Sequence, residues 1–428
     1  MANSESDAVE ELLLLHVSGQ DRRGLLAELT GRLASGGVQV LDIGQAIVHE
    51  QLVLSILARF VGSAANNALL LRRLSTLAEE RGVSLRYSTV GSDDYEHWVR
   101  GQGQDRYILT LLSAGVDAGN LAAVSEVISR HGLNVYAVSR LSNRVALVDV
   151  ENSKRSSLEM TLRGRIADED ALKRDLLAAA SAYDFDCSIQ LDSVYRRNRR
   201  LVAFDMDSTL IRAEVIDELA RRHGVYDAVA AITARAMAGE LDFAASLRER
   251  VGLLRGLPAS TLSEVAASVE LSDGAERLLL ALGHFGYRTA ILSGGFQPIG
   301  EDLARRLGID HVFANRLQIR DGVLTGELDG EIIDAEAKAR KLIELCAAQG
   351  ISVGQAIALG DGANDLPMLA TAGLGIAFHA KPLVKESADH SISRFGLDSV
   401  LYLLGFSDAE IEFVTNAEAR RQSEVVKS

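Results

Sequence analysis

Cysteine is scarce in this chain of 428 residues, which contains only Cys187 and Cys346. Two cysteines in core-like segments exclude a disulfide-based scaffold and a cysteine-rich zinc site. Long apolar runs are also missing, so no segment reaches the length that spans a bilayer. The acidic stretch Met1–Glu11 leads only into a short leucine run, without the basic and apolar regions of a signal peptide. We therefore expect a soluble, cytoplasmic protein.

Positive charge is in deficit, with 45 Lys and Arg residues against 59 Asp and Glu residues and a net charge of −14 at pH 7. This balance disfavours a broad nucleic-acid-binding surface. The basic run at residues 196–200 is too short for one and lacks interleaved aromatic residues. An anionic substrate would need a local positive site. The hydrophobic content of 47% is that of a globular protein, and the length predicts about two to three domains.

An internal repeat occupies the first half of the chain. Residues 18–27 align with residues 113–122, and residues 37–40 align with residues 132–135 at the same offset of 95 residues. Each copy has the pattern of a strand, a glycine-bearing loop and an amphipathic helix, followed by strand, strand, helix and strand. This βαββαβ order predicts two ferredoxin-like domains. We expect them at residues 1–92 and 106–195.

A polar, glycine-containing linker is expected between these domains at residues 93–105. After residue 195, short apolar strand patterns alternate with helical patterns, which predicts an α/β domain with a doubly wound parallel sheet at residues 196–415. No strand pattern occurs from about 212 to 272, so we expect a helical cap there. The polar residues 416–428 are expected to form a flexible tail.

Two aspartates, Asp205 and Asp207, follow the first apolar strand pattern of the α/β domain at residues 201–204. Side chains two residues apart on an extended strand point the same way, and ligands bind at the carboxyl ends of strands in doubly wound sheets. One carboxylate could act as a nucleophile while the other handles a proton. The alternative is a pair of loop-capping aspartates.

Three later segments carry groups that complement these aspartates. Ser293 and the two glycines after it can cradle phosphate oxygens. Lys338 can supply a positive charge, although a solvated lysine on a helix is the alternative. The oxygen-rich run at residues 360–365 suits Mg²⁺. The sequence has no G-x-x-x-x-G-K-[ST] motif and no complete dinucleotide-binding fingerprint.

Taken together, these segments resemble the motif set of the haloacid dehalogenase superfamily over residues 201–404, and within it the phosphoserine phosphatases. The runs that carry the closer resemblance are Asp205–Thr209, Ser293–Phe296, Phe313–Leu317, Gly360–Asp365 and His379–Pro382. The resemblance implies a Mg²⁺-dependent hydrolase that converts O-phospho-L-serine to L-serine and phosphate through an aspartyl-phosphate. This reaction is the last step of L-serine biosynthesis.

The resemblance also implies roles for single residues. Asp205 would be the nucleophile and Asp207 the general acid and base. Mg²⁺ would be held by Asp205, Asp361 and the backbone carbonyl of Asp207, with Asp365 supporting the water shell of the metal and Lys338. The residues implied to bind the transferring phosphoryl group are Ser293, Gly294, Lys338 and Asn364.

Four residues of the expected cap match family positions that select the substrate. Glu214 would bind the ammonium group of phosphoserine and Arg250 its carboxylate. Met237 and Phe243 would close over the substrate and exclude water. On spacing alone, Arg250 could equally form a helix ion pair with a neighbouring acid. Met237 and Phe243 could equally be core residues of the cap.

The N-terminal repeat resembles paired ACT domains, as in the ACT-bearing phosphoserine phosphatases of actinobacteria. Such domains bind amino acids at a strand-to-helix turn, which Asp21 and Gly24 match here in the D-x-x-G pattern. In the second copy Asp117 is one residue closer to Gly119. The resemblance implies a homodimer and L-serine as an inhibitory effector. The alternative is that both ACT domains serve only dimerisation.

Two other functions remain open at this stage. A related enzyme could pass the phosphoryl group to another acceptor, such as homoserine. The chain could also be an amino-acid-sensing protein whose phosphatase domain is inactive. The presence of Asp205, Asp207, Ser293, Lys338 and Asp361 together favours an active enzyme.

Overall fold

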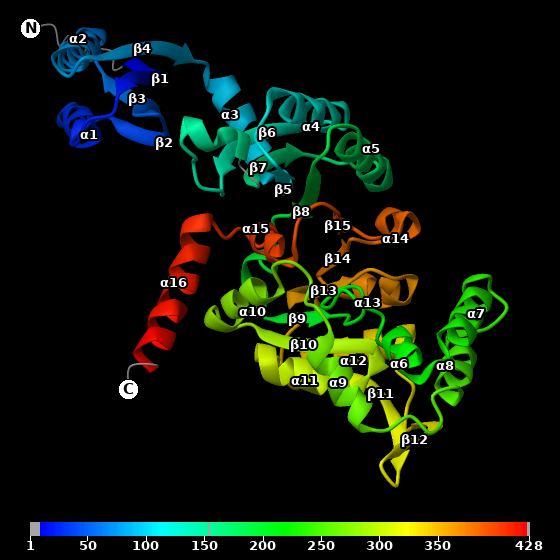
Figure 1. Ribbon diagram of the computed structural model, residues 1–428. Coiled ribbons are helices and arrows are strands. Elements are labelled where there is room, and N and C mark those ends of the chain that lie inside the picture. The colour runs from blue at the N-terminus through cyan, green and yellow to red at the C-terminus, as the bar shows by residue number, and fades with distance from the viewer. Residues whose placement is uncertain (1–8, 153–154, 426–428) are drawn as a thin grey trace, which may run out of the picture. The chain divides into compact units, whose positions relative to one another are not determined.

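The computed structural model describes residues 9–152 and 155–425 (Figure 1). The chain divides into two compact units, Met1–Gln104 and Asp105–Ser428. The first unit holds the first copy of the repeat, and the second unit holds the second copy together with the α/β domain. Among the described residues, no helix combines the length and the apolar character that crossing a membrane requires.

A four-stranded antiparallel sheet with two helices forms the first unit, in the strand order β2-β3-β1-β4. The elements are β1 (Val9–Gln20), α1 (Leu25–Ser35), β2 (Gln39–Val48), β3 (Gln51–Gly62), α2 (Ala64–Glu80) and β4 (Val83–Val90). Leucines recur along one side of both helices, and Leu29 and Leu74 are buried against the sheet. The βαββαβ order predicted for this copy is confirmed.

The stretch predicted as a linker, residues 93–105, is helical over most of its length. It contains α3 (Ser92–Arg100) and the short 3₁₀ helix η1 (Gly101–Gly103). Asp93 and Asp94 lie in the first turn of α3, where carboxylates interact favourably with the free backbone N–H groups. The boundary between the two compact units follows directly after residue 104.

The second copy of the repeat has the same topology as the first, with the strand order β6-β7-β5-β8. The elements are β5 (Arg106–Ser113), α4 (Ala118–Arg130), β6 (Leu133–Arg140), η2 (Leu147–Asn152), β7 (Ser156–Gly164), α5 (Glu169–Ala182) and β8 (Asp186–Leu191). Its core joins apolar residues of β5 and β7 to those of α4 and α5, with Leu109 and Val124 fully buried.

The α/β domain contains a seven-stranded sheet in the order β12-β11-β10-β9-β13-β14-β15. The strands are β9 (Leu201–Phe204), β10 (Arg288–Phe296), β11 (His311–Arg320), β12 (Val323–Asp329), β13 (Ala356–Gly360), β14 (Leu374–Phe378) and β15 (His390–Ile392). Neighbouring strands are parallel, except that β12 at the edge is antiparallel to β11. The predicted parallel sheet is therefore confirmed.

Alternate residues of β9 belong to two different cores, as a period of two requires. Val202 and Phe204 pack with α10 (Ala275–His284) and α11 (Gln297–Leu307), whereas Ala203 packs with α12 (Ala335–Ala348) and α13 (Leu366–Thr371). Helices thus cover both faces of the sheet. The remaining short elements are η3 (Arg196–Asn198), η4 (Val353–Gln355), η5 (Ala363–Asp365), α14 (Pro382–Ser387), η6 (Leu397–Ser399) and α15 (Val400–Leu403).

Four helices occupy the region predicted as a helical cap, after β9. They are α6 (Val215–His223), α7 (Tyr226–Met237), α8 (Phe243–Gly252) and α9 (Ser260–Ser268). Backbone hydrogen bonds tie the end of this region to the β11–β12 hairpin: Gly256 donates to Leu324 O at 2.8 Å and Ala259 donates to Gly322 O at 2.8 Å. These two hydrogen bonds therefore attach the end of the cap to the hairpin at the edge of the sheet.

The second repeat copy packs against the α/β domain through β8 and β15. Ser188 Oγ and His390 Nδ1 are 2.9 Å apart, and the buried Asp186 carboxylate accepts hydrogen bonds from the backbone N–H groups of Ser393 and Arg394. Since these groups are largely removed from water, they need one another as hydrogen-bond partners. The contact therefore joins the second copy to the α/β domain within one compact unit.

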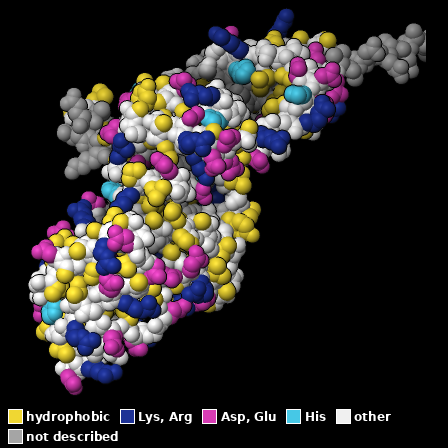
Figure 2. Space-filling model, turned by 90° about the vertical axis from the view of Figure 1, so that its right-hand side faces the viewer, with side chains coloured by type: hydrophobic (Ala, Val, Ile, Leu, Met, Phe, Trp, Pro, Cys, Tyr) yellow, Lys and Arg dark blue, Asp and Glu magenta, His cyan; other side chains and the backbone are white. Residues whose placement is uncertain are grey.

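The chain ends in α16 (Asp408–Val425), which covers most of the stretch predicted as a flexible tail. Residues 426–428 of that stretch, residues 1–8 of the first expected domain and residues 153–154 of the second lie outside the described residues. Figure 2 shows Lys and Arg side chains interspersed with Asp and Glu on the visible face. The negative net charge is thus not gathered in one patch of that face.

Candidate active site

The site begins at the carboxyl end of β9, the central strand of the sheet. The backbone N–H of Asp205 donates to Leu359 O at 2.8 Å, so the extended chain continues beside β13 into the aspartate. β10 and β13 flank β9. Ser293 in β10 and Asp361 after β13 therefore come to the same edge of the sheet as Asp205.

Lys338 lies on the second turn of α12 and is fully buried. Its Nζ donates to Oδ1 of Asp205 at 2.7 Å and to Oδ1 of Asp365 at 2.6 Å. Burial by itself lowers the pKa of a lysine, but the charges of the two carboxylates outweigh this effect and raise the pKa of Lys338 above its ordinary value. The alternative of a solvated helix lysine is wrong.

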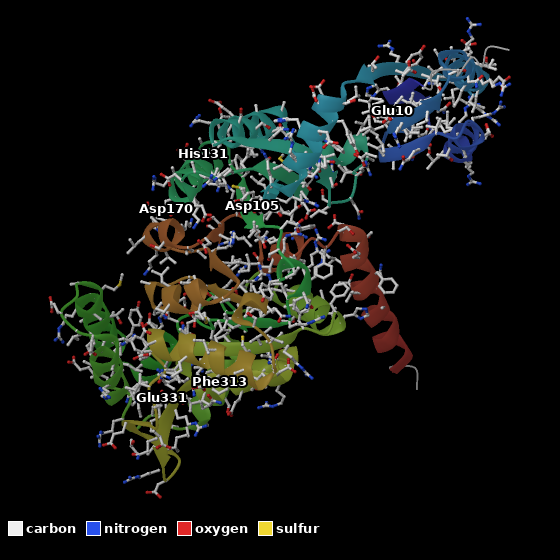
Figure 3. All side chains as sticks on the ribbon, turned by 180° about the vertical axis from the view of Figure 1, so that it is seen from behind. Glu10, Asp105, His131, Asp170, Phe313 and Glu331 are labelled. Carbon is white, nitrogen blue, oxygen red and sulfur yellow. The ribbon has the colours of Figure 1, made fainter. Side chains whose placement is uncertain are left out.

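The start of α12 holds Lys338 in this position. The Asp334 side chain caps the helix by accepting a hydrogen bond from Ala337 N at 2.9 Å. One turn later, Lys341 Nζ lies 5.7 Å from the centre of the Phe313 ring and 3.8 Å from a carboxylate oxygen of Glu331 (Figure 3). Lys338 and Lys341 thus occupy different environments, one buried and one at the surface.

Three carboxylates at this edge could hold a metal ion. Asp205, Asp361 and Asp365 each offer one oxygen, and these oxygens lie within 4.8 Å of one another. Burial, with the nearby Asp365 charge, raises the pKa of Asp205 to about 7 and that of Asp361 to about 6. Because their ionised forms lack enough positive charge nearby, a divalent cation would suit the cluster.

Asp207 is a different kind of acid. Burial, followed by the charge of Glu214, raises the pKa of Asp207 well above its ordinary value. Its Oδ1 is buried and has no hydrogen-bond partner among the residues that the structure describes. The raised pKa favours the protonated carboxyl, which can donate its proton.

The loop after the apolar part of β10 lies close to Asp207. A methyl group at Gly295 would lie 2.5 Å from Met206 Cε and 2.9 Å from Asp207 Oδ2, so only glycine fits there without displacement. Gly295 N donates to Ser293 Oγ at 2.9 Å. Because the hydroxyl oxygen accepts this bond, the hydroxyl proton of Ser293 remains available to a ligand.

A cavity of about 670 Å³ joins the sheet edge to the cap. The predicted site residues that line it are Asp205, Asp207, Glu214, Met237, Phe243, Arg250, Ser293, Gly294, Asp361 and Asn364. Lys338 and Asp365 lie behind this wall, fully buried. The structure therefore brings every predicted residue of the catalytic half into one neighbourhood.

The cap residues meet the Ser293–Gly295 loop directly. A methyl group on Gly294 would lie 2.9 Å from Phe243 Cζ, so the ring covers this glycine. Arg250 Nε donates to its own helix at Ser246 O, 3.3 Å away, and no ion pair of Arg250 occurs among the described residues. Met237 is 71% exposed and lies on the rim rather than in the core of the cap.

Comparison with known proteins identifies the family. A family model of haloacid dehalogenase-like hydrolases matches residues 202–370, and an ACT domain model matches residues 11–88. A phosphoserine phosphatase of Streptomyces coelicolor is 38% identical over 401 residues, which are 94% of this chain and 93% of that protein. The chain belongs to the phosphoserine phosphatase family.

Two further similarities agree with membership of the phosphoserine phosphatase family. A phosphoserine phosphatase of Mycobacterium tuberculosis is 37% identical over 400 residues, which are 94% of each chain. The crystal structure of a haloacid dehalogenase family hydrolase from Salmonella enterica is 34% identical and has a TM-score of 0.61. The similarity covers 70% of this chain and 98% of that one.

Some residues of this phosphoserine phosphatase family member were given no role by the sequence. Ser208 adopts a φ of 58°, which is strained for serine, and its Oγ donates to Glu214 Oε1 at 2.8 Å. Asn315 is buried, donates to Gly294 O at 2.8 Å and accepts from Ile333 N at 2.9 Å. The sequence signal that could have indicated a role for Asn315 is its position as a polar residue inside the apolar pattern of β11. Lys381 lines the cavity.

The expected effector residues of this family member are not among the residues that line the catalytic cavity. Asp21 and Gly24 occupy the turn between β1 and α1 in the first unit, where Gly24 has a φ of 87°. Gly119 lies in the first turn of α4 in the second unit. Asp117 caps that helix, since its Oδ1 accepts a hydrogen bond from Asn120 N at 2.8 Å.

Proposed function

We propose that this chain hydrolyses O-phospho-L-serine to L-serine and phosphate, the last step of L-serine biosynthesis, with Asp205 as the nucleophile. The observation that carries the proposal is the buried Lys338 bound to Asp205 Oδ1, beside Asp207, whose pKa is raised by burial, and the Ser293–Gly295 loop. The ammonium group favours the ionised form of Asp205 and partly offsets the burial that raises its pKa, and one carboxylate oxygen of Asp205 is left for attack.

In the first step, a carboxylate oxygen of Asp205 forms a bond to phosphorus while the bond between phosphorus and the serine oxygen breaks. Asp207 donates its proton to the departing serine oxygen. Ser293, the Gly294 amide, Lys338 and Asn364 would bind the phosphoryl oxygens. This arrangement stabilises the charge that spreads over those oxygens in the transition state.

In the second step, the ionised Asp207 takes a proton from a water molecule, whose oxygen attacks phosphorus. The bond between phosphorus and Asp205 then breaks, and phosphate leaves with the oxygen of that water. Asp207 is thereby returned to its protonated form. The raised pKa of Asp207 favours its protonated form and therefore favours the uptake of a proton from water in this step.

The carboxylate cluster fits Mg²⁺, which we propose as the cofactor. Asp205, Asp361 and the backbone carbonyl of Asp207 would hold the ion. When bound, Mg²⁺ supplies positive charge to the phosphoryl oxygens. Asp365 accepts from Lys338 at Oδ1 and from Gly362 N at Oδ2, 3.0 Å away, so both of its oxygens already have partners. A supporting position behind the metal suits it better than direct ligation.

We propose that the cap selects phosphoserine by its charges. Glu214, oriented by Ser208, would bind the substrate ammonium, and Arg250 would bind the carboxylate. Arg250 suits this role because it is half-buried and has no ion-pair partner among the described residues. Phe243 and Met237 would close over the bound substrate and exclude water.

The N-terminal half would regulate the enzyme. We propose ACT domains at residues 1–92 and 106–195, a catalytic domain at residues 196–415, a homodimer formed through the ACT domains, and L-serine binding near Gly24 or Gly119 that lowers activity. Serine titrated against wild type and Gly119→Ala should give different inhibition curves. Identical curves, or competition only with phosphoserine, would overturn the proposed effector site.

Phosphate release from phosphoserine with Mg²⁺ present tests the catalytic proposal. Asp205→Asn should lower kcat by about 1,000-fold or more. Asp227→Asn, an exposed aspartate on α7, is the matched control and should keep wild-type activity. Equal phosphate release by Asp205→Asn would overturn the mechanism. Turnover that requires added homoserine would show a phosphotransferase instead.

A further inference from the structure

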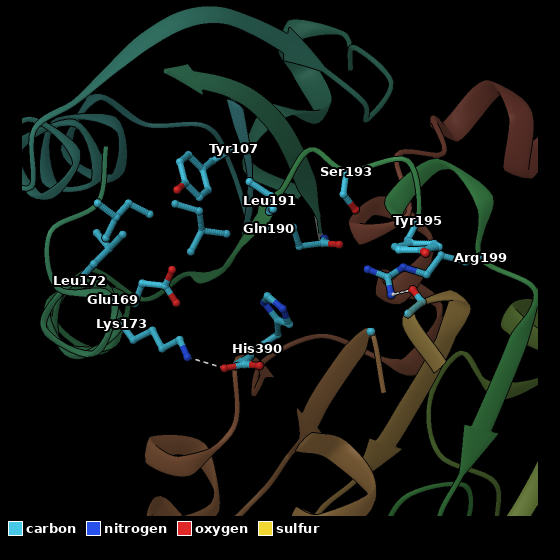
Figure 4. A pocket seen from close by; sticks show the side chains of 15 residues that line it. Tyr107, Glu169, Leu172, Lys173, Gln190, Leu191, Ser193, Tyr195, Arg199 and His390 are labelled. Atoms are coloured by element: carbon cyan, nitrogen blue, oxygen red, sulfur yellow. Dashed lines mark hydrogen bonds and ion pairs between the residues drawn. The ribbon is translucent and has the colours of Figure 1, made fainter. Parts of the chain in front are cut away.

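A second cavity, separate from the catalytic one, lies where the second repeat copy meets the α/β domain (Figure 4). Its volume of about 330 Å³ is in the range of small-ligand sites. One wall comes from β5, α5 and β8. The other wall comes from the segments that precede β9, β13, β14 and β15. These segments lie at the amino edge of the sheet. The catalytic residues lie at the carboxyl edge, so the two cavities are at opposite ends of the strands.

Arg199 in the wall of this cavity is a buried cation that forms no ion pair with any residue the structure describes. It is 5% exposed, and its Nη1 donates to the backbone oxygens of Gly354 and Ala356 at 3.1 and 3.3 Å. Its Nε has no hydrogen-bond partner among the described residues. Burial lowers the pKa of Arg199 to about 10, so the group stays charged at neutral pH. A buried cation of this kind calls for an anionic partner such as a carboxylate.

Gln190 in the opposite wall presents an unused acceptor. It is 5% exposed, and its Nε2 donates to Leu403 O at 2.9 Å. Its Oε1 is buried and finds no donor in the part of the chain that the structure describes. Figure 4 shows the amide oxygen of Gln190 directed toward the side of the cavity that holds Arg199. The walls of the cavity therefore hold one donor and one acceptor that lack partners among the described residues, which suits a ligand with both groups.

The rest of the lining indicates what the remainder of the ligand should be. Ile166, Leu172 and Tyr107 contribute apolar surface to the lining. The Glu169 carboxylate lies beside Leu172 in the same wall (Figure 4). The Lys173 ammonium and the Asp389 carboxylate pair with each other at the same cavity, so neither is free to serve the ligand. An aliphatic or aromatic side chain would fill the apolar part.

We propose that this cavity binds a free α-amino acid with an apolar side chain. Its carboxylate pairs with Arg199, its ammonium group donates to Gln190 Oε1, and its side chain packs on Ile166 and Leu172. The ligand contacts both the second repeat copy and the amino edge of the catalytic sheet, so binding strengthens their contact. The inference does not depend on the catalytic proposal, since it concerns residues at the other end of the strands.

Calorimetric titration of the full-length protein with L-leucine and L-phenylalanine tests the proposal. We expect saturable binding of at least one of them at one site per chain. Ile166→Trp fills the cavity and Arg199→Gln removes the cation, and each should weaken binding by about ten-fold or more. Val194→Trp, at a 78% exposed residue that does not line the cavity, is the matched control and should bind as wild type.

Two analogues of leucine test the pairing of charges. 4-Methylpentanoate lacks the ammonium group and 3-methylbutylamine lacks the carboxylate, so each should bind about ten-fold more weakly or worse. Asp205→Asn should bind leucine as wild type does. If neither amino acid binds at concentrations up to about 10 mM, the proposal is overturned. Unchanged leucine binding by Ile166→Trp would also overturn the proposal. This variant provides the test if Arg199→Gln fails to fold.

Discussion

At the scale of single residues, one ammonium group serves two buried carboxylates. Lys338 contacts Asp205 and Asp365, which are 133 and 27 residues away in the chain. Removing a buried charge from water is costly, and only close partners with good geometry offset that cost. The lysine therefore acts both on Asp205, the proposed nucleophile, and on the stability of the sheet edge.

Replacing the shared lysine should damage stability and activity together. Lys338→Met leaves Asp205 and Asp365 buried beside each other, so we expect a loss of about 3 to 5 kcal/mol in the free energy of unfolding. We also expect kcat to fall by at least about 100-fold, because a phosphoryl-binding charge is lost. Urea unfolding and phosphate release measure the two effects.

Lys341→Met is the control for this change, since Lys341 pairs with Glu344 and Glu331 at the surface. It should alter stability by less than about 1 kcal/mol. A Lys338→Met variant with wild-type kcat would contradict the role given to Lys338.

Asp207 should separate catalysis from stability. Because burial raises the pKa of Asp207, the fold favours the protonated carboxyl over the ionised one. Asp207→Asn has nearly the same shape and no charge, so Tm should be unchanged or higher. Loss of proton transfer should lower kcat by about 100-fold to 10,000-fold. Calorimetry and initial rates test this pair of expectations, and a large fall in Tm would show that Asp207 is ionised in the fold.

Not all of these residues are equally predictable from sequence. Asp205 and Asp207 could be predicted as a pair, because the geometry of a strand directs side chains two residues apart to one side. The partners of Lys338 could not be predicted from spacing, because only the folded sheet brings Asp205 to α12. The role of Asn315 could not be predicted from sequence either, because its hydrogen bonds join β11 to the backbone of two other segments.

At the scale of elements, the end of β10 is shaped by close backbone approach. Gly295 lies against Met206 and Asp207, whereas a methyl group at Gly283 in α10 would meet no atom within 4 Å. The sequence does not distinguish a glycine in close contact, such as Gly295, from one in open space, such as Gly283. The helical cap, by contrast, could be predicted from the long absence of strand patterns between 212 and 272.

A methyl group at the end of β10 should therefore harm the reaction. In Gly295→Ala, the new Cβ would press on Met206 Cε and Asp207 Oδ2, and we expect kcat to fall by about ten-fold to 100-fold through displacement of the proton donor. Gly283→Ala should keep wild-type rates and gain up to about 1 kcal/mol of stability, since alanine favours the helix. Equal rates in both variants would show that the β10 loop tolerates the displacement.

α3 shows where the element-level prediction was incomplete. The glycines at 91, 101 and 103 indicated a linker, but Gly91 and Gly101 lie at the two ends of α3 and leave its interior free of glycine. Tyr95 and Trp98 inside α3 contact each other, with ring centres 5.9 Å apart. A pattern that marks helix ends can thus resemble one that marks an irregular linker.

At the scale of the whole molecule, the second repeat copy belongs to the same compact unit as the α/β domain. The repeat predicts two similar domains, yet only the structure shows that β8 of the second copy meets β15. Sequence could not reveal this, because the hydrogen bond between Ser188 and His390 joins residues 202 positions apart. The two copies therefore differ in their surroundings rather than in their topology.

This contact should respond to pH through His390. Burial, with a smaller effect of the charge of Arg199, lowers the pKa of His390 to about 4, against 6.5 in the unfolded chain. Between these values the unfolded chain binds a proton that the folded protein does not, so stability is full above about pH 6.5 and falls as the pH drops toward 4. Thermal unfolding at pH 7 and pH 5 should show the lower Tm at pH 5.

His390→Gln provides the control for this prediction, since glutamine can bond to Ser188 without titrating. The difference in Tm between pH 7 and pH 5 should be smaller in this variant than in wild type. An equal difference in both proteins would assign the pH dependence to other groups.

The central claim is that Asp205 becomes phosphorylated during turnover. Acid quenching of the enzyme during turnover of phosphoserine, followed by tritiated borohydride reduction and peptide mapping, measures this directly, because the reagent reduces an acyl phosphate. We predict label on Asp205, with none in Asp205→Asn and none without phosphoserine. Label on another residue, or active turnover with no label on Asp205, would contradict the mechanism.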